Sequence, residues 1–192
     1  MFFEFFKILC YNKNKNIWKE IFGLKTISIL FTEYTDFASR IVHFWSGGGY
    51  THVSIALDEE NEYFYSFNTK GFRKEYPKKH KNRTKKNVCY LLEVTEECFL
   101  KLKEMIKSFE EKKEKHKYNW IGMILLFLNI SYRNKYNYYC TQFVTYLLKE
   151  ANIIKWKHKF RPYFPNQIMK ELNKSSLLKK IVHNPIPMLS WH

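Results

Sequence analysis

Short stretches of apolar and β-branched residues, bounded by polar or glycine-rich turns, recur through the first half of the chain. They predict four strands: "TISILF" (26–31), "YTHVSIALD" (50–58), "EYFYSFN" (62–68) and "VCYLLEV" (88–94). Only the polar turn "EEN" separates the second strand from the third, so we expect these two to form a hairpin.

Apolar residues at helical spacing predict helices between and after these strands. The expected helices are "TDFASRIVHFW" (35–45), a long helix capped by Thr95, "WIGMILLFLNI" (120–130), "CTQFVTYLLKEANI" (140–153) and one in the tail "FRPYFPNQIMKEL" (160–172). Thr35 or Asp36 is the expected N-cap of the first, and "SGGG" ends it. The apolar helix at 120–130 is expected to be buried.

The order of these elements predicts a mixed α+β fold. With 192 residues, 45% of them hydrophobic, the chain is long enough for one domain with its own core. Residues 1–24 form an amphipathic segment broken by "NKNKN", so we interpret them as an N-terminal extension. Residues 25–192 are then the single folded domain.

The chain is strongly basic, with a formal net charge of +15. This charge is compatible with a solvated lysine surface or with an anionic membrane surface. A nucleic-acid partner is not expected, because no known nucleic-acid motif accompanies the basic run "KKHKNRTKK" (78–86).

The longest apolar run, 120–130, is too short to cross a bilayer. The start of the chain lacks the basic region and small-residue cleavage site of a secretory signal. We therefore expect a cytoplasmic protein, either soluble or peripheral on a membrane.

The four cysteines show no close pairing and no CxxC motif, so we expect reduced thiols. The histidines are scattered without metal-ligand spacing, and neither a metal site nor a cofactor is expected.

Cys140 stands at the expected start of a helix. Free N–H groups and the helix dipole stabilise a thiolate at such a position, and they could also hold an oxyanion. A thiolate nucleophile needs a base, and His52 at the edge of a strand is the candidate. The alternative is that Cys140 is a small buried apolar residue and His52 a structural one.

Four motifs, in order, resemble the permuted NlpC-type family of papain-like thiol hydrolases, in particular its YiiX-like branch. They are "ISILFTEYTDFASRIVHFW", the histidine strand "YTHVSIAL", the cysteine helix "YYCTQFVTYLLKEANI" and "FRPYFPNQIMKEL", which together span residues 26–172. The resemblance implies a circularly permuted papain-like fold, in which a small antiparallel sheet packs against helices including the cysteine-bearing helix.

The same resemblance implies that Cys140 is the nucleophile and that His52 is the general base and acid. It also implies a third polar residue, often Glu, on the strand after the histidine, and the alignment puts Ser66 there. Asn68, on the same strand face, is the alternative residue to orient the imidazole. Tyr50 and Tyr139 flank the pair, and they either line a substrate cleft or belong to the core.

These features predict a cysteine hydrolase or acyltransferase that cleaves an amide or ester through a thioester on Cys140. The aromatic content and the apolar run 120–130 favour a lipid or lipid-modified substrate. Two alternatives stay open: a cell-wall or peptide amidase of the same fold, and a non-catalytic basic binding module.

Overall fold

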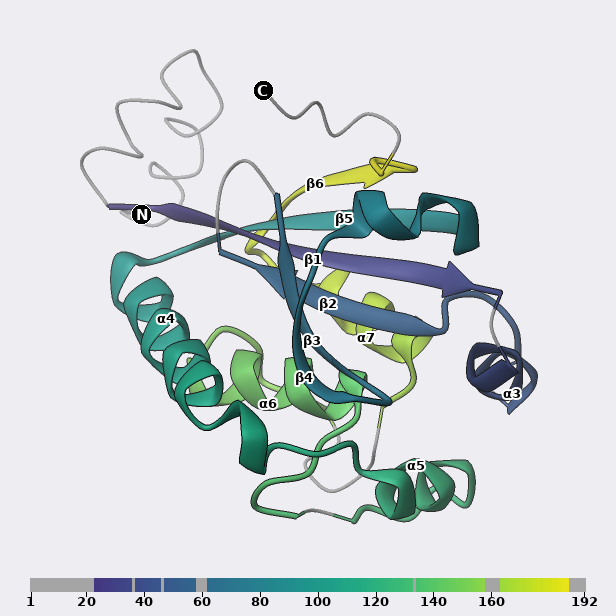
Figure 1. Cartoon of the computed structure of the whole chain (residues 1–192). Helices are drawn as coiled ribbons and strands as arrows, with labels where there is room; N and C mark the ends of the chain where they lie inside the picture. The colour runs from purple at the N-terminus through teal and green to yellow at the C-terminus, as the bar shows by residue number, and fades with distance from the viewer. Residues whose placement is uncertain are drawn as a thin grey trace.

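The computed structural model describes residues 23–35, 37–45, 47–57, 62–132, 134–157 and 163–186. In this part of the chain, a six-stranded antiparallel sheet packs with five α-helices, so the fold is α+β as expected (Figure 1). The strands are β1 (Lys25–Tyr34), β2 (His52–Ala56), β3 (Phe64–Asn68), β4 (Gly71–Glu75), β5 (Thr84–Val94) and β6 (Leu178–His183). The α-helices are α3 (Phe37–Trp45), α4 (Glu96–Glu111), α5 (Trp120–Phe127), α6 (Cys140–Glu150) and α7 (Pro165–Leu172), and the 3₁₀-helices are η1 (Pro77–Arg83) and η2 (Lys113–Lys115).

The strand order in the sheet is β4-β3-β2-β1-β5-β6. The central strand β1 is buried from Ile27 to Glu33 and pairs with β5 on one side and β2 on the other. β3 and β4 form a tight hairpin in which Asn68 pairs with Gly71. This hairpin crosses β1 and β2 at a steep angle, so β4 does not simply continue a flat sheet (Figure 1).

The larger core lies between the sheet and three helices. Ile29 of β1 and Ile55 of β2 belong to the same buried cluster as Leu102 of α4, Phe143 of α6 and Ile168 of α7. Figure 1 shows α4, α6 and α7 together beneath the sheet, with α3 beside its edge and α5 further below. A smaller buried cluster contains Leu30, Ala56, Phe64, Cys89 and Ile186.

The four expected strands are present, but β4 and β6 were not expected from the sequence. The basic run at 78–86 is not a loop, because it forms most of η1 and the start of β5. Thr95 caps α4 as expected, and its Oγ1 accepts a hydrogen bond from the N–H of Cys98. The expected cap Asp36 and nearly all of the N-terminal extension lie outside the described residues.

The apolar helix expected to be buried is exposed along one side. In α5, Gly122, Met123 and Leu126 are buried, whereas Ile121 and Ile124 are 60% and 57% exposed. The exposure of Ile121 and Ile124 could not be predicted from the sequence, because the residues on both sides of this helix are apolar. No helix among the described residues is long and apolar enough to cross a membrane.

Candidate active site

Cys140 is the first residue of α6, as expected. The extended Tyr139 precedes the helix, and the first helical hydrogen bond runs from the N–H of Phe143 to the carbonyl of Tyr139. The N–H groups of Cys140, Thr141 and Gln142 therefore have no carbonyl partner within the helix. Their partial positive charge surrounds the half-buried thiol.

His52 is the first residue of β2, opposite Thr32 of β1. Two bonds to β1 fix the entry of this strand: the N–H of Thr51 donates to the Thr32 carbonyl, and the Thr51 hydroxyl accepts from the N–H of Tyr34. His52 and Cys140 line the same cavity, and the thiol is close enough to the imidazole to contribute to raising its pKa. The fold thus joins two side chains that lie 88 positions apart.

Glu75, at the end of β4, holds the other side of the imidazole. The Nε2 atom of His52 lies 2.9 Å from Oε2 of Glu75, and both side chains are buried. Because this N–H donates to the carboxylate, Nδ1 is the ring nitrogen left to face Cys140. The amide of Asn68 donates to Oε1 of Glu75 at 3.3 Å, so it fixes the second carboxylate oxygen.

Glu75, rather than Ser66 or Asn68, the two residues predicted for the third position, is hydrogen-bonded to the imidazole. The Ser66 hydroxyl donates to the Val53 carbonyl at 2.7 Å, and Asn68 contacts Glu75 rather than the ring. Glu75 was missed because no strand was expected between residues 68 and 88. The segment "NTKGFRKE" could have indicated it, because a possible hairpin turn at 68–71 is followed by a short strand that ends in the single acid Glu75.

The charge of Glu75 changes the acidity of the imidazole. Burial by itself lowers the pKa of His52, but the Glu75 carboxylate and hydrogen bonds to Cys140 and Glu75 outweigh burial. The pKa of His52 is therefore raised well above its ordinary value of 6.5. The protonated form of His52 is therefore favoured next to the Glu75 carboxylate.

These residues line a cavity of about 430 Å³. Its walls carry Tyr34, Ser39 and Val42 near one side and Tyr118, Met123, Leu126 and Pro165 near the other. Lys70 and Arg83 add positive charge to the lining. An apolar chain attached to a polar, reactive group would match this mixture of walls.

The two tyrosines singled out in the sequence have different surroundings. Tyr139 lines the cavity beside Cys140 and packs with Met123 and Leu126. The ring of Tyr50 instead packs against Phe31 in the core, with Lys86 over its other side. Of these two tyrosines, Tyr139 is the one among the described residues that line the cavity.

A hydroxyl next to the thiol has no partner. Thr141 is 2% exposed and lines the cavity. Among the hydrogen bonds of the described residues, none involves its Oγ1 atom. A buried polar group without a partner is costly to the folded state.

Gln142 connects the cysteine helix to α5, although the sequence suggested no role for it. Its Oε1 atom accepts from the amide of Asn119 at 3.1 Å, and its Nε2 donates to the Tyr132 carbonyl at 2.7 Å. Asn119 is also the N-cap of α5, where its Oδ1 accepts from the N–H of Gly122 at 2.8 Å. The cavity wall formed by α5 is thereby tied to the start of α6.

The glycine loop before β2 is held from α7. The amide of Asn166 donates to the Gly48 carbonyl at 2.6 Å. Gly49 has a φ of +93°, and a Cβ there would approach the Asn166 amide nitrogen to 2.7 Å. Glycine is therefore required for both the backbone conformation and the contact that leads the chain into His52.

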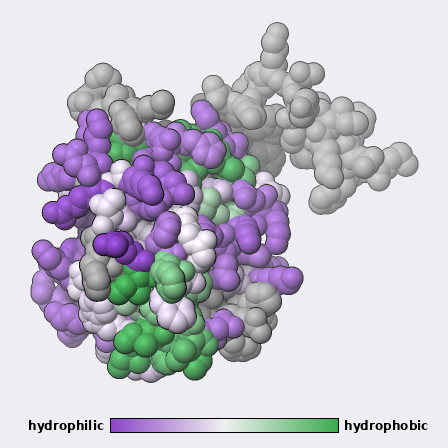
Figure 2. Space-filling model, turned by 90° about the vertical axis from the view of Figure 1, so that its right-hand side faces the viewer, coloured by the Kyte–Doolittle hydropathy of each residue, from purple (hydrophilic) through white to green (hydrophobic). Residues whose placement is uncertain are grey.

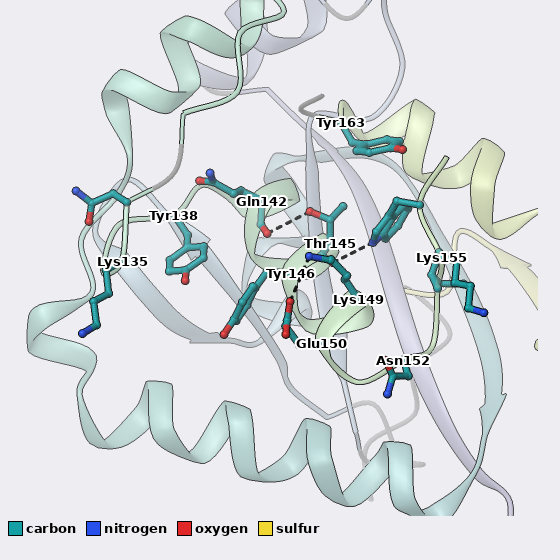
Figure 3. A pocket seen from close by; sticks show the side chains of 13 residues that line it. Lys135, Tyr138, Gln142, Thr145, Tyr146, Lys149, Glu150, Asn152, Lys155 and Tyr163 are labelled. Atoms are coloured by element: carbon teal, nitrogen blue, oxygen red, sulfur yellow. Dashed lines mark hydrogen bonds and ion pairs between the residues drawn. The ribbon is translucent and has the colours of Figure 1, made fainter. Parts of the chain in front are cut away.

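A larger cavity of about 590 Å³ lies further along α6 (Figure 3). Tyr138 and Tyr146 form one part of its lining, and Trp156 and Tyr163 form another. No cysteine, serine or histidine is among its described lining residues. Despite its size, this cavity brings no thiol and imidazole together among its described lining residues, so the Cys140–His52 pairing points to the smaller one.

The other reactive groups offer no competing site. Cys89, Cys98 and Cys140 are free thiols, and burial raises the pKa of Cys89 to about 12. No cluster of three or more His, Cys, Asp and Glu side chains in the described ranges could hold a metal ion. Compared with known proteins, the chain matches no family model and no curated protein.

Proposed function

We propose that the chain is a cysteine-dependent hydrolase or acyltransferase that acts on an amide or ester. The observation that carries this proposal is the line of contacts from Cys140 through His52 to Glu75 in the wall of one cavity. A nucleophile, a base and a group that orients the base are the three parts that acyl transfer requires. The sequence resemblance to permuted papain-like thiol hydrolases supports the same assignment.

In the first half-reaction, the Cys140 thiolate attacks the carbonyl carbon of the substrate. The C–S bond forms as the carbonyl π electrons move to oxygen, and the N–H groups at the start of α6 stabilise the oxyanion. His52 then donates its Nδ1 proton to the leaving nitrogen or oxygen, whose bond to carbon breaks. The products are a thioester on Cys140 and a free amine or alcohol.

In the second half-reaction, neutral His52 removes a proton from water or from another acceptor. The acceptor oxygen or nitrogen attacks the thioester, the C–S bond breaks and the thiolate returns. Glu75 keeps its negative charge throughout and stabilises the imidazolium. Water as acceptor gives hydrolysis, and an alcohol or amine gives acyl transfer.

The cavity walls favour a substrate with an apolar acyl group. Val42, Met123 and Leu126 line the space next to the thiol, together with the rings of Tyr118 and Tyr139. Lys70 and Arg83 suit an anionic group on the same substrate. A lipid or lipid-modified amide or ester combines both features.

Site-resolved alkylation tests the proposal. The full chain is treated with limiting iodoacetamide at neutral pH, and the labelling of each cysteine is measured by mass spectrometry. Cys140 is expected to react much faster than half-buried Cys98, while Cys89 is an internal unreactive reference because its pKa is about 12. A Cys140 that reacts no faster than Cys98, or equally fast in His52→Ala, would overturn the proposal.

A further inference from the structure

Several large exposed apolar side chains lie on α3 and on or just after α5, two helices that also contribute residues to the cavity wall. We call this group the apolar ledge: Phe44, Trp45, Trp120, Ile121, Ile124 and Leu128. Phe44 is 79% exposed and Leu128 61% exposed. In Figure 2, hydrophobic side chains gather at the bottom of the molecule, which is the end where α5 lies in Figure 1. Exposed apolar patches of this kind mark sites of interaction.

The apolar ledge is continuous between α3 and α5 and leads into the cavity. The ring of Trp45 stacks on Phe127 with centroids 5.3 Å apart, which joins the two helices. The same two helices also carry Val42 and Met123, which line the cavity. A molecule resting on the apolar ledge is therefore next to the cavity that contains Cys140.

The segments that carry the apolar ledge are basic. No Asp or Glu occurs between Glu114 and Glu150 in the sequence, whereas five Lys and Arg residues do. α3 contains Arg40 and no acid, and Glu33, which contacts His43 of α3, is buried and paired with Lys85 and Lys86. Exposed apolar side chains on basic segments match a bilayer surface with anionic headgroups, and Trp is favoured at that depth.

We propose that the apolar ledge docks the protein on a bilayer that contains anionic lipids. Ile121, Ile124 and Leu128 enter the boundary between headgroups and acyl chains, and nearby Lys and Arg contact the headgroups. This orientation brings the ester or amide of a lipid to the cavity, a consequence that rests on the proposed acyl-transfer function. A second copy of the chain is a poorer occupant, because two molecules of net charge +15 repel each other.

Vesicle cosedimentation of the full chain tests the docking. Vesicles of phosphatidylcholine alone are compared with vesicles that also contain phosphatidylserine. The wild type is expected to bind the anionic vesicles, and Ile121→Ser with Ile124→Ser is expected to weaken binding by at least about tenfold, since two apolar side chains are lost. Leu100→Ser is the matched control, because Leu100 is 51% exposed on α4, outside the apolar ledge.

Each outcome decides the proposal. Binding lost in the double variant and kept in Leu100→Ser supports it. It is overturned if the wild type does not bind, or if the double variant binds equally well through another segment such as residues 1–24. Light scattering that shows a wild-type dimer and a monomeric double variant also overturns it, in favour of self-association.

The same experiment separates docking from catalysis. Cys140→Ser is expected to bind anionic vesicles as tightly as the wild type, because the thiol is not on the apolar ledge. Vesicle binding without a fast-reacting Cys140 would leave docking intact and remove the enzyme proposal. A fast-reacting Cys140 without vesicle binding would leave the enzyme proposal intact and remove the docking proposal.

Discussion

The imidazole of His52 and the carboxylate of Glu75 lie 2.9 Å apart, although they belong to strands that are not neighbours in the sheet. The steep β3–β4 hairpin brings the end of β4 to the start of β2 (Figure 1). Asn68 of the same hairpin holds the second carboxylate oxygen. The hairpin is thus the element that orients the imidazole toward Cys140.

Glu75→Gln is expected to slow the alkylation of Cys140. The amide keeps the shape of the side chain but loses the charge that raises the pKa of His52. A lower pKa moves the balance from protonated toward neutral imidazole at neutral pH. The alkylation rate between pH 5 and pH 9, measured by mass spectrometry, checks both the rate and the shift of its pH profile.

Ser66→Ala is the matched control in the same hairpin. Its hydroxyl bonds to the Val53 carbonyl, so its loss is expected to cost about 1 kcal/mol of stability without changing the reactivity of Cys140. The opposite pattern, with Ser66→Ala slowing alkylation and Glu75→Gln having no effect, would restore Ser66 as the orienting residue.

Local sequence patterns predicted where Cys140 and His52 lie in their elements, and the structure has both residues at those places, while their catalytic role stays a prediction. A cysteine at the start of an apolar helix and a histidine opening a buried strand are both visible within a few residues. Glu75 could not be assigned to the site in the same way, because its contact depends on the angle at which the hairpin crosses β2. The exposed side of α5 could not be predicted from the sequence either, because both sides of this helix are apolar and only its packing against the rest of the protein decides which side is buried.

The raised pKa of His52 predicts a pH-dependent stability. Above pH 6.5 the unfolded chain releases the His52 proton, whereas the folded protein keeps it until the higher folded pKa is reached. The contribution is complete below pH 6.5 and is lost as pH rises through the folded pKa. The free energy of unfolding in urea, compared between wild type and His52→Gln, should show a difference that shrinks across this window. A difference that grows with pH would contradict the raised pKa.

Thr141→Val is expected to reduce catalysis without reducing stability. Its hydroxyl is buried in the cavity without a described partner, so valine removes no hydrogen bond of the free protein. If the hydroxyl binds the substrate carbonyl, kcat/KM falls by about tenfold, the value of one lost hydrogen bond. Hydrolysis of p-nitrophenyl butyrate and the urea midpoint measure the two effects.

Thr145→Val is the control for that substitution. It lies one turn along the same helix, and its hydroxyl already donates to the Thr141 carbonyl. We expect it to lower the urea midpoint while leaving kcat/KM close to that of the wild type. Equal losses of kcat/KM in both variants would assign the effect to the helix rather than to the Thr141 hydroxyl.

Gly122→Ala is expected to destabilise the protein, against the usual preference for alanine in helices. A Cβ at Gly122 would collide with the side-chain amide of Asn119. That side chain caps α5 and bonds to Gln142, so displacing it should outweigh the gain of about 1 kcal/mol that alanine normally brings. In an Asn119→Ala background the collision is absent, and Gly122→Ala should become stabilising. Urea unfolding of the wild type, Gly122→Ala, Asn119→Ala and the double variant measures the effect of Gly122→Ala on the free energy of unfolding in both backgrounds. A stabilising effect in both backgrounds would show that the Asn119 cap does not hold α5 against α6.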